Sequence, residues 1–172
     1  ASVITTGADN VALGYHSLNA CTSGSQNVAI GRNALDNNTT ASENTAVGYN
    51  SATANTTGTA NVALGKAALF LNTTASNNTA IGYHSLLSNT TGSHNAVLGA
   101  RALDANTTGY FNVAVGESCL GANTTGYSNV AVGYNSLSSN TAGAGNVAIG
   151  EEAMLNTTSS ANVAIGNDAA KA

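Results

Sequence analysis

Apolar and polar positions alternate over short segments that recur along the whole chain. Residues 27–31 read N-V-A-I-G, and close variants of this pattern return at residues 44–48 and 61–65. A short alternation that ends at a glycine is typical of a β-strand. The recurring glycines and Asn-Thr-Thr runs are poor helix formers, and the chain contains no proline. We therefore expect one short strand in each repeat.

The repeat has a nearly constant length. Its leading asparagine returns every seventeen residues from Asn10 to Asn146, and only the last step, to Asn162, is sixteen residues. We number each repeat from this asparagine, as position 1, and the repeats as coils 1 to 10. A short fixed period indicates a solenoid in which each repeat is one coil. The sequence thus predicts an all-β fold, a parallel β-solenoid (β-roll) of about ten 17-residue coils, as a single repeat array over residues 1–172.

Equivalent positions of successive coils should stack about 4.7–4.9 Å apart, which gives a rod on the order of 45–50 Å long. Asparagines at positions 1 and 12 are then predicted to form ladders of stacked side-chain amides, each giving and receiving a hydrogen bond. Position 1 holds Asn10, Asn27, Asn44, Asn61, Asn78, Asn95, Asn112, Asn129, Asn146 and Asn162, and position 12 holds Asn38, Asn55, Asn72, Asn89, Asn106, Asn123 and Asn140. Position 15, mostly glycine, is predicted to be a turn that favours a positive φ.

The orientation of the strands decides which side chains meet a partner. The aliphatic residues at positions 2, 4 and 9 are expected to point inward, so position 3 is expected to point outward. A row of methyl groups on a surface suggests that another backbone approaches it closely, and we predict a lateral interface there. Position 3 holds Ala12, Ala29, Ala46, Ala63, Ala80, Ala114, Ala131, Ala148 and Ala164, with Val97 as the exception. The alternative is that these alanines fill a tight corner of the coil's own interior.

Burial of three aliphatic side chains per coil is not enough to offset the ordering of seventeen residues. Association with other copies would bury more surface, so we expect a homo-oligomer with three chains around an axis. The array consists of whole coils without polar caps at its ends, and uncapped solenoid ends tend to pair. We therefore also expect either a piece of a longer fibre or head-to-tail stacking into filaments.

The pentad N-[VT]-A-[IVL]-G, at residues 27–31 and 78–82, resembles the repeat of trimeric autotransporter adhesin heads of the YadA type. The longer segment at residues 83–92 is similar to repeats of bacterial and phage tail-fibre-like surface proteins. The resemblance covers almost the whole chain. It implies a left-handed, trimeric β-roll in extracellular fibres that display or bind at cell or virion surfaces.

Composition narrows the function further. Four Lys and Arg against eight Asp and Glu, spread thinly, leave no basic patch for a nucleic acid, and no apolar run is long enough for membrane insertion. The three histidines and the scattered acids do not come together at a spacing that suits a metal or a pair of catalytic carboxylates. We expect no enzymatic activity and no cofactor. Cys21 and Cys119 lie six coils apart and cannot form a disulfide within one straight rod.

Position 6 and its neighbour carry the large variable side chains. A row of solvated residues is the simplest interpretation of them. The alternative is a face that recognises a host-surface glycan or protein through Tyr15, Tyr49, Tyr83, Tyr134, His16 and His84, together with Asn50. Aromatic and cationic residues alternate in coils 1 to 5 of this row, which predicts cation–π contacts between coils.

The sequence thus favours a non-enzymatic structural or adhesive fibre protein that associates with itself. Ice binding is the second hypothesis, because Thr recurs at position 13 and, in most coils, at position 14 on a rod of low charge. Adjacent threonines followed by glycine are more typical of a turn. Asn-Thr-Thr also matches the N-glycosylation acceptor pattern at Asn38 and its equivalents and at Asn156, but one glycan on every coil would be too crowded.

Overall fold

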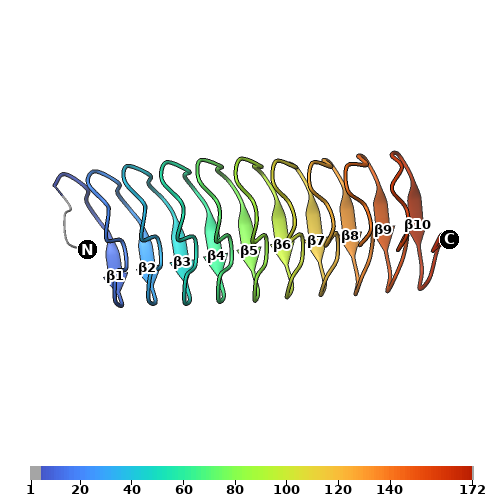
Figure 1. Cartoon of the computed structure of the whole chain (residues 1–172), viewed down its shortest axis with the longest axis horizontal. Coiled ribbons are helices and arrows are strands. Elements are labelled where there is room, and N and C mark those ends of the chain that lie inside the picture. The colour runs from blue at the N-terminus through green and yellow to red at the C-terminus, as the bar shows by residue number, and fades with distance from the viewer. Residues whose placement is uncertain (1–4, 172) are drawn as a thin grey trace.

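The chain forms a rod of stacked coils around one continuous sheet. The computed structural model describes residues 5–171, and residues 1–4 and 172 of the predicted array lie outside that part. Ten parallel strands follow one another along the rod in chain order (Figure 1). Within residues 5–171 there is no helix, so the predicted parallel β-solenoid is confirmed. The strands are β1 (Val11–Leu13), β2 (Val28–Ile30), β3 (Thr45–Val47), β4 (Val62–Leu64), β5 (Thr79–Ile81), β6 (Ala96–Leu98), β7 (Val113–Val115), β8 (Val130–Val132), β9 (Val147–Ile149) and β10 (Val163–Ile165).

Neighbouring strands pair at equivalent repeat positions. Ala29 of β2 stands beside Ala46 of β3, a step of seventeen residues, and this register holds up to β9. The hydrogen bonds between coils also continue outside the strands, as between Thr39 N–H and Thr56 C=O at 3.1 Å and between Leu35 N–H and Ser51 C=O at 3.1 Å. Because most of the coil takes part in these ladders, the whole rod is tied together by backbone pairing.

Backbone turns with positive φ follow each strand, and they lie at other repeat positions than the predicted position 15. Gly at position 5 has a φ between 129° at Gly31 and 149° at Gly99. Positive φ angles recur at positions 7, 9 and 17 on residues other than glycine, including φ 51° at Leu86. Gly24 and Gly58, at position 15, are not among the residues with positive φ, so that prediction is wrong. Position 15 is instead buried, and its carbonyl oxygen accepts hydrogen bonds from both asparagine ladders.

The interior is narrow and combines aliphatic with amide side chains. Leu at position 9 is fully buried in most coils, beside the small residues of position 8 and the alanines of position 3. The asparagines of positions 1 and 12 are buried as well. The side chains of position 9 point inward, as predicted. Positions 2 and 4 do not, because the leucines and the amides leave room in the middle of the strand for little more than a methyl group.

Candidate functional site

The strands turn their aliphatic side chains outward, which corrects the predicted lateral interface. From Ala29 to Ala148 the alanines of position 3 are at most 1% exposed, and Ala164 is 7% exposed. They fill the coil's own interior, as the alternative interpretation has it, and cannot present methyl groups to another chain. Ala12 is exposed, in the first strand. The residues that face outward are those of positions 2 and 4, on either side of each alanine.

We call the outward side chains of positions 2 and 4 in strands β1 to β10 the sheet face. Position 2 holds seven valines, two threonines and one alanine, and position 4 holds only Val, Leu or Ile. Its residues are half-buried in most of the middle strands, exposed in β6, where Leu98 is 50% exposed, and more open at both ends, with Leu13 66% and Val163 71% exposed. None of the twenty positions carries a charge. The sheet face is therefore a continuous aliphatic strip along the rod.

Both asparagine sets form hydrogen-bonded ladders inside the rod. At position 1 each side-chain oxygen accepts from the next coil, as Asn27 Oδ1 accepts from the Asn44 backbone N–H at 3.0 Å and from its Nδ2 at 3.3 Å. At position 12 the amide donates to the preceding coil, as Asn72 Nδ2 donates to Asn55 Oδ1 at 2.8 Å. These bonds compensate for burying amides. They also place the Asn-Thr-Thr asparagines of position 12 out of reach of glycosylation, whereas Asn156 is exposed.

The threonines of position 13 take part in a third ladder. The hydroxyl of Thr56 donates to the Thr73 carbonyl at 3.0 Å, and the hydroxyl of Thr90 donates to the Thr107 carbonyl at 3.0 Å. The same bond recurs from Thr22 to Thr124. These hydroxyl groups therefore hold neighbouring coils together and are not free donors on the surface. Position 14 is exposed, with threonine in coils 2 to 7.

The row at position 6 runs along the edge where the strands end. Tyr15, Tyr49, Tyr83 and Tyr134 are all exposed. Tyr15 stacks on His16 and Tyr83 on His84, with ring centroids 3.9 and 3.8 Å apart. The predicted cation–π contacts are present, with the Arg32 guanidinium 5.5 Å from the centre of the Tyr15 ring and Lys66 Nζ 5.6 Å from the centre of the Tyr83 ring. We call these side chains of positions 6 and 7 the tyrosine row.

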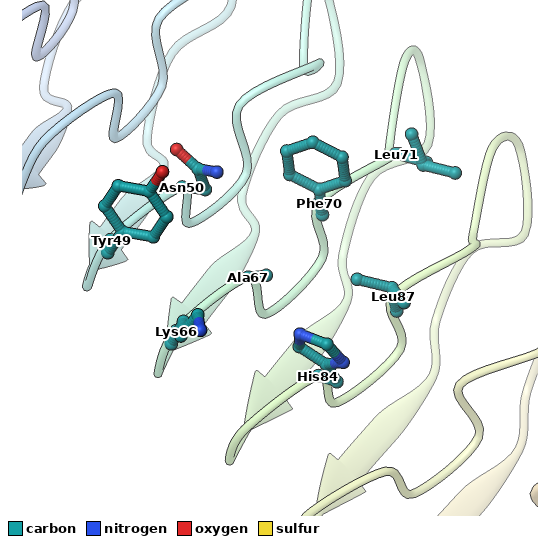
Figure 2. Close-up of a pocket in the computed structure, with 8 residues that line it drawn as sticks. All are labelled: Tyr49, Asn50, Lys66, Ala67, Phe70, Leu71, His84 and Leu87. Carbon is teal, nitrogen blue, oxygen red and sulfur yellow. The ribbon is translucent and has the colours of Figure 1, made fainter.

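A cavity of about 370 Å³ opens beside this row in coils 3 to 5 (Figure 2). Its apolar lining consists of Ala67, Phe70, Leu71 and Leu87. Leu71 is 41% exposed, which is unusual for a leucine of this chain outside the sheet face. The residues at positions 10 and 11 of most other coils are small or polar, so the cavity results from local departures from the repeat.

Four polar side chains complete the cavity: Tyr49, Asn50, Lys66 and His84. Asn50 Oδ1 accepts from Asn33 Nδ2 at 2.9 Å, while its own amide donates no hydrogen bond within residues 5–171. Lys66 forms no ion pair in that part of the chain, where the ion pairs are those of Lys171 with Glu152 and Asp168. The cavity thus combines apolar walls with a cation that has no carboxylate partner and an amide that donates no hydrogen bond in the described residues.

On the other edge of the sheet, four aromatic side chains form an exposed cluster at positions 16 and 17. Tyr110 and Tyr127 stack with centroids 5.0 Å apart and an interplanar angle of 3°. Phe111 contacts both Tyr110 and His94, at 5.5 and 4.9 Å. Neither this cluster nor the cavity is predicted from the repeat pattern. The signal that could have found them is the same in both cases: bulky apolar or aromatic residues where other coils have small or polar ones.

The remaining chemistry-bearing residues lie apart from these surfaces. Cys21 and Cys119 are free thiols and fully buried. Burial raises the pKa of the Cys119 thiol to about 12. Burial likewise raises the pKa of the Asp104 carboxyl, against the opposing effects of its backbone hydrogen bond and of Arg101. Across residues 5–171, no three His, Cys, Asp or Glu side chains are grouped so that they could hold a metal ion.

The described residues contain no helix that is long and apolar enough to cross a membrane. Comparison with known proteins leaves the chain without an assigned family. No family model, no curated protein and no solved structure matches it.

Proposed function

We propose that this chain is a non-enzymatic structural protein that builds a fibre by packing the sheet face of one copy against that of others. The observation that carries the proposal is the uncovered sheet face itself. Parallel sheets are almost always covered on both faces, and here the coil covers only the inner one. A face without charge along twenty strand positions is poorly suited to water and well suited to another copy.

The sheet face is long and narrow, and a trimer is the arrangement that we propose for it. Ten strands about 4.8 Å apart, each of three residues at about 3.3 Å, give a strip roughly 48 Å by 10 Å. Such a strip offers less than the roughly 800 Å² per partner of a standard interface. When three strips surround one axis, each packs against two others and the aliphatic side chains are removed from water. A trimer is also what the resemblance of the N-V-A-I-G pentads implies.

In this arrangement the tyrosine row and the aromatic cluster flank the interface. Their rings and charges could then contact a glycan or a protein on another surface, which is the adhesive part of the proposal. Ice binding is less well supported. The position 13 hydroxyl groups are used in bonds between coils, and the exposed threonines of position 14 form a single row.

Sedimentation equilibrium tests the proposal. The wild-type chain should have the mass of three copies at tens of micromolar, and a Leu64→Lys/Ile81→Lys double variant should have the mass of one copy, because each change places a charge in the apolar interface. Thr74→Lys/Thr91→Lys is the matched control, since it adds the same charge at exposed positions on another face and should leave the mass at three copies. A monomeric wild type, or a double variant with unchanged mass, would contradict the proposal.

A further inference from the structure

The cavity of coils 3 to 5 is formed by several changes to the repeat that act together. At position 7, six of coils 1 to 9 have Asn, His or Arg, whereas coil 4 has Ala67. Ala67 removes a side chain from the middle of a row and leaves a hollow. At positions 10 and 11 the same coil has Phe70 and Leu71, and the next coil has Leu87, where most other coils have small or polar residues. These three provide apolar walls around the hollow (Figure 2).

The hollow is a slot about one ring thick. Asn50 and His84 occupy position 7 on either side of Ala67, as the backbone bonds Ala67 N–H to Tyr49 C=O (2.9 Å) and His84 N–H to Lys66 C=O (3.1 Å) establish. Two coil steps separate Asn50 from His84, about 9.6 Å. One planar group needs contacts of about 3.5–4.0 Å on each side, or about 7–8 Å in all. A six-membered ring, flat or saturated, fits this space.

The charges around the slot select for an anion. Lys66 has no carboxylate partner in the described residues, and the Asn50 amide has an unused donor. Tyr83, over which the Lys66 ammonium lies, keeps that cation beside the slot. The nearest acids along position 10 are Asp36 and Asp104, each two coils away from Phe70, and Asp104 interacts electrostatically with Arg101 and His84. Apolar walls with a few converging polar groups are typical of sites for small ligands.

We infer that this cavity binds a small cyclic carboxylate, with the ring over Ala67 between Asn50 and His84, and the carboxylate at Lys66 and the Asn50 amide. Phe70, Leu71 and Leu87 enclose the apolar edge of the ring. The site lies within one chain, and it does not depend on the proposed fibre function. It would make coil 4 a binding coil within an otherwise structural array.

Three probes of similar size test the inference by NMR titration of the ¹⁵N-labelled chain. Benzoate is planar and anionic, cyclohexanecarboxylate is anionic but not planar, and benzamide is planar but neutral. A ligand of this size should bind with a dissociation constant on the order of 1–10 mM. We expect benzoate and cyclohexanecarboxylate each to bind at least fivefold more tightly than benzamide and to shift the amide signals of Ala67, His84 and their neighbours. Equal affinity for all three, or shifts elsewhere, would overturn the inference.

Variants that keep the fold locate the site. Ala67→Asn restores the residue of Asn33 and Asn50 at a φ of 53°, which asparagine adopts at 57° in Asn50, so the rod should stay intact while benzoate binding is lost. Lys66→Gln should weaken benzoate at least fivefold and leave benzamide unchanged. Asn135→Ala is the control, because it opens the same position in coil 8, where Ser138 and Ser139 stand in place of Phe70 and Leu71, and it should neither create nor remove binding. Undiminished benzoate binding by Ala67→Asn would overturn the assignment.

Discussion

Gly82 closes strand β5 with a φ of 132°, a region that side chains with a Cβ rarely adopt. A Cβ at this residue would also lie 2.5 Å from the carbonyl oxygen of Gly99 in the next coil. We therefore expect Gly82→Ala to destabilise the chain by about 2 kcal/mol or more through backbone strain and a broken coil contact. Urea unfolding followed by circular dichroism measures the loss.

Gly145 supplies a control for Gly82. Its φ is 68°, close to the values that Gln26 and Glu43 adopt at the same repeat position, and no atom lies within 4 Å of a Cβ added there. Gly145→Ala should change the free energy of unfolding by about 0.5 kcal/mol or less. If both variants unfold at the same urea concentration, the distinction between the two glycines is wrong.

The Cys119 thiol makes stability depend on pH in the alkaline range. Its pKa is raised from 9.0 to about 12 because the folded chain buries it, so the unfolded chain loses this proton at lower pH than the folded one. The thiol's contribution is complete below about pH 9 and is lost as pH rises towards 12, at up to about 1.4 kcal/mol per pH unit. Urea unfolding at pH 8, 10 and 11 measures this.

Cys119→Ala isolates the contribution of the thiol. Alanine is native to this position in coils 2, 4, 6 and 9, so the variant should fold. As the pH rises above 9, the unfolding free energy of the wild type should fall relative to that of the variant. A difference that stays constant from pH 8 to 11 would contradict the prediction.

At the scale of the strand, the sequence shows the alternation but not its phase. Val28, Ala29 and Ile30 alternate with period two, which indicates that one side of the strand faces the interior. The larger residues, Val28 and Ile30, are the ones that the sequence predicts on that side. The structure reverses this because the interior is already filled by leucine at position 9 and by two asparagine ladders. The left-handed backbone at Leu86, with φ 51°, is also invisible in the sequence, since leucine rarely adopts it. Ladders, by contrast, depend only on the period and could be predicted.

The single shortened repeat interrupts one of these ladders. The carbonyl oxygen of the Asn140 side chain is buried without a hydrogen-bond partner. Coil 9 has sixteen residues, and its Asn-Thr-Thr segment begins one residue early, so that Asn156 is at position 11. The Thr157 N–H bonds to Met154 C=O, which is the bond that joins position 12 to position 9 in other coils. Thr157 therefore stands where the ladder needs an asparagine, while Asn156 is exposed and donates to the Lys171 carbonyl at 3.0 Å.

Thr157→Asn should repair the ladder. The new amide can donate to Asn140 Oδ1, as Asn140 Nδ2 donates to Asn123 Oδ1 at 2.9 Å, and we expect a gain of about 1 kcal/mol in the free energy of unfolding. Asn156→Ser serves as the control, because it removes the neighbouring amide without adding a hydrogen-bond donor to the ladder. No gain in Thr157→Asn, or an equal gain in both variants, would show that Asn140 is not the weak point.

At the scale of the whole molecule, each strand of residues 5–171 contacts only its neighbours along the rod (Figure 1). The period, read from the sequence, is enough to predict this architecture. The cavity and the aromatic cluster depend on which surfaces the coil turns outward, and the period does not contain that information. Phe70 and Tyr110 are departures whose meaning becomes clear only when neighbouring coils are stacked.

A stack of this kind should tolerate the loss of one complete repeat. Deletion of residues 120–136 removes seventeen residues and joins position 8 of one coil to position 9 of the next, so every ladder continues in phase. We expect a single cooperative thermal transition, slightly lower than that of the wild type, because one set of contacts between coils is gone. Differential scanning calorimetry records the number of transitions.

Deletion of residues 120–135 removes one residue fewer and leaves a coil of eighteen at the junction. The coils on either side remain regular, but leucine at position 9 and both asparagine ladders are out of phase across that one step. Since stability in such an array depends on coupling between neighbours, the rod should divide there into two units that unfold in separate transitions. A single transition at the same temperature in both deletions would mean that register between coils does not hold the rod together.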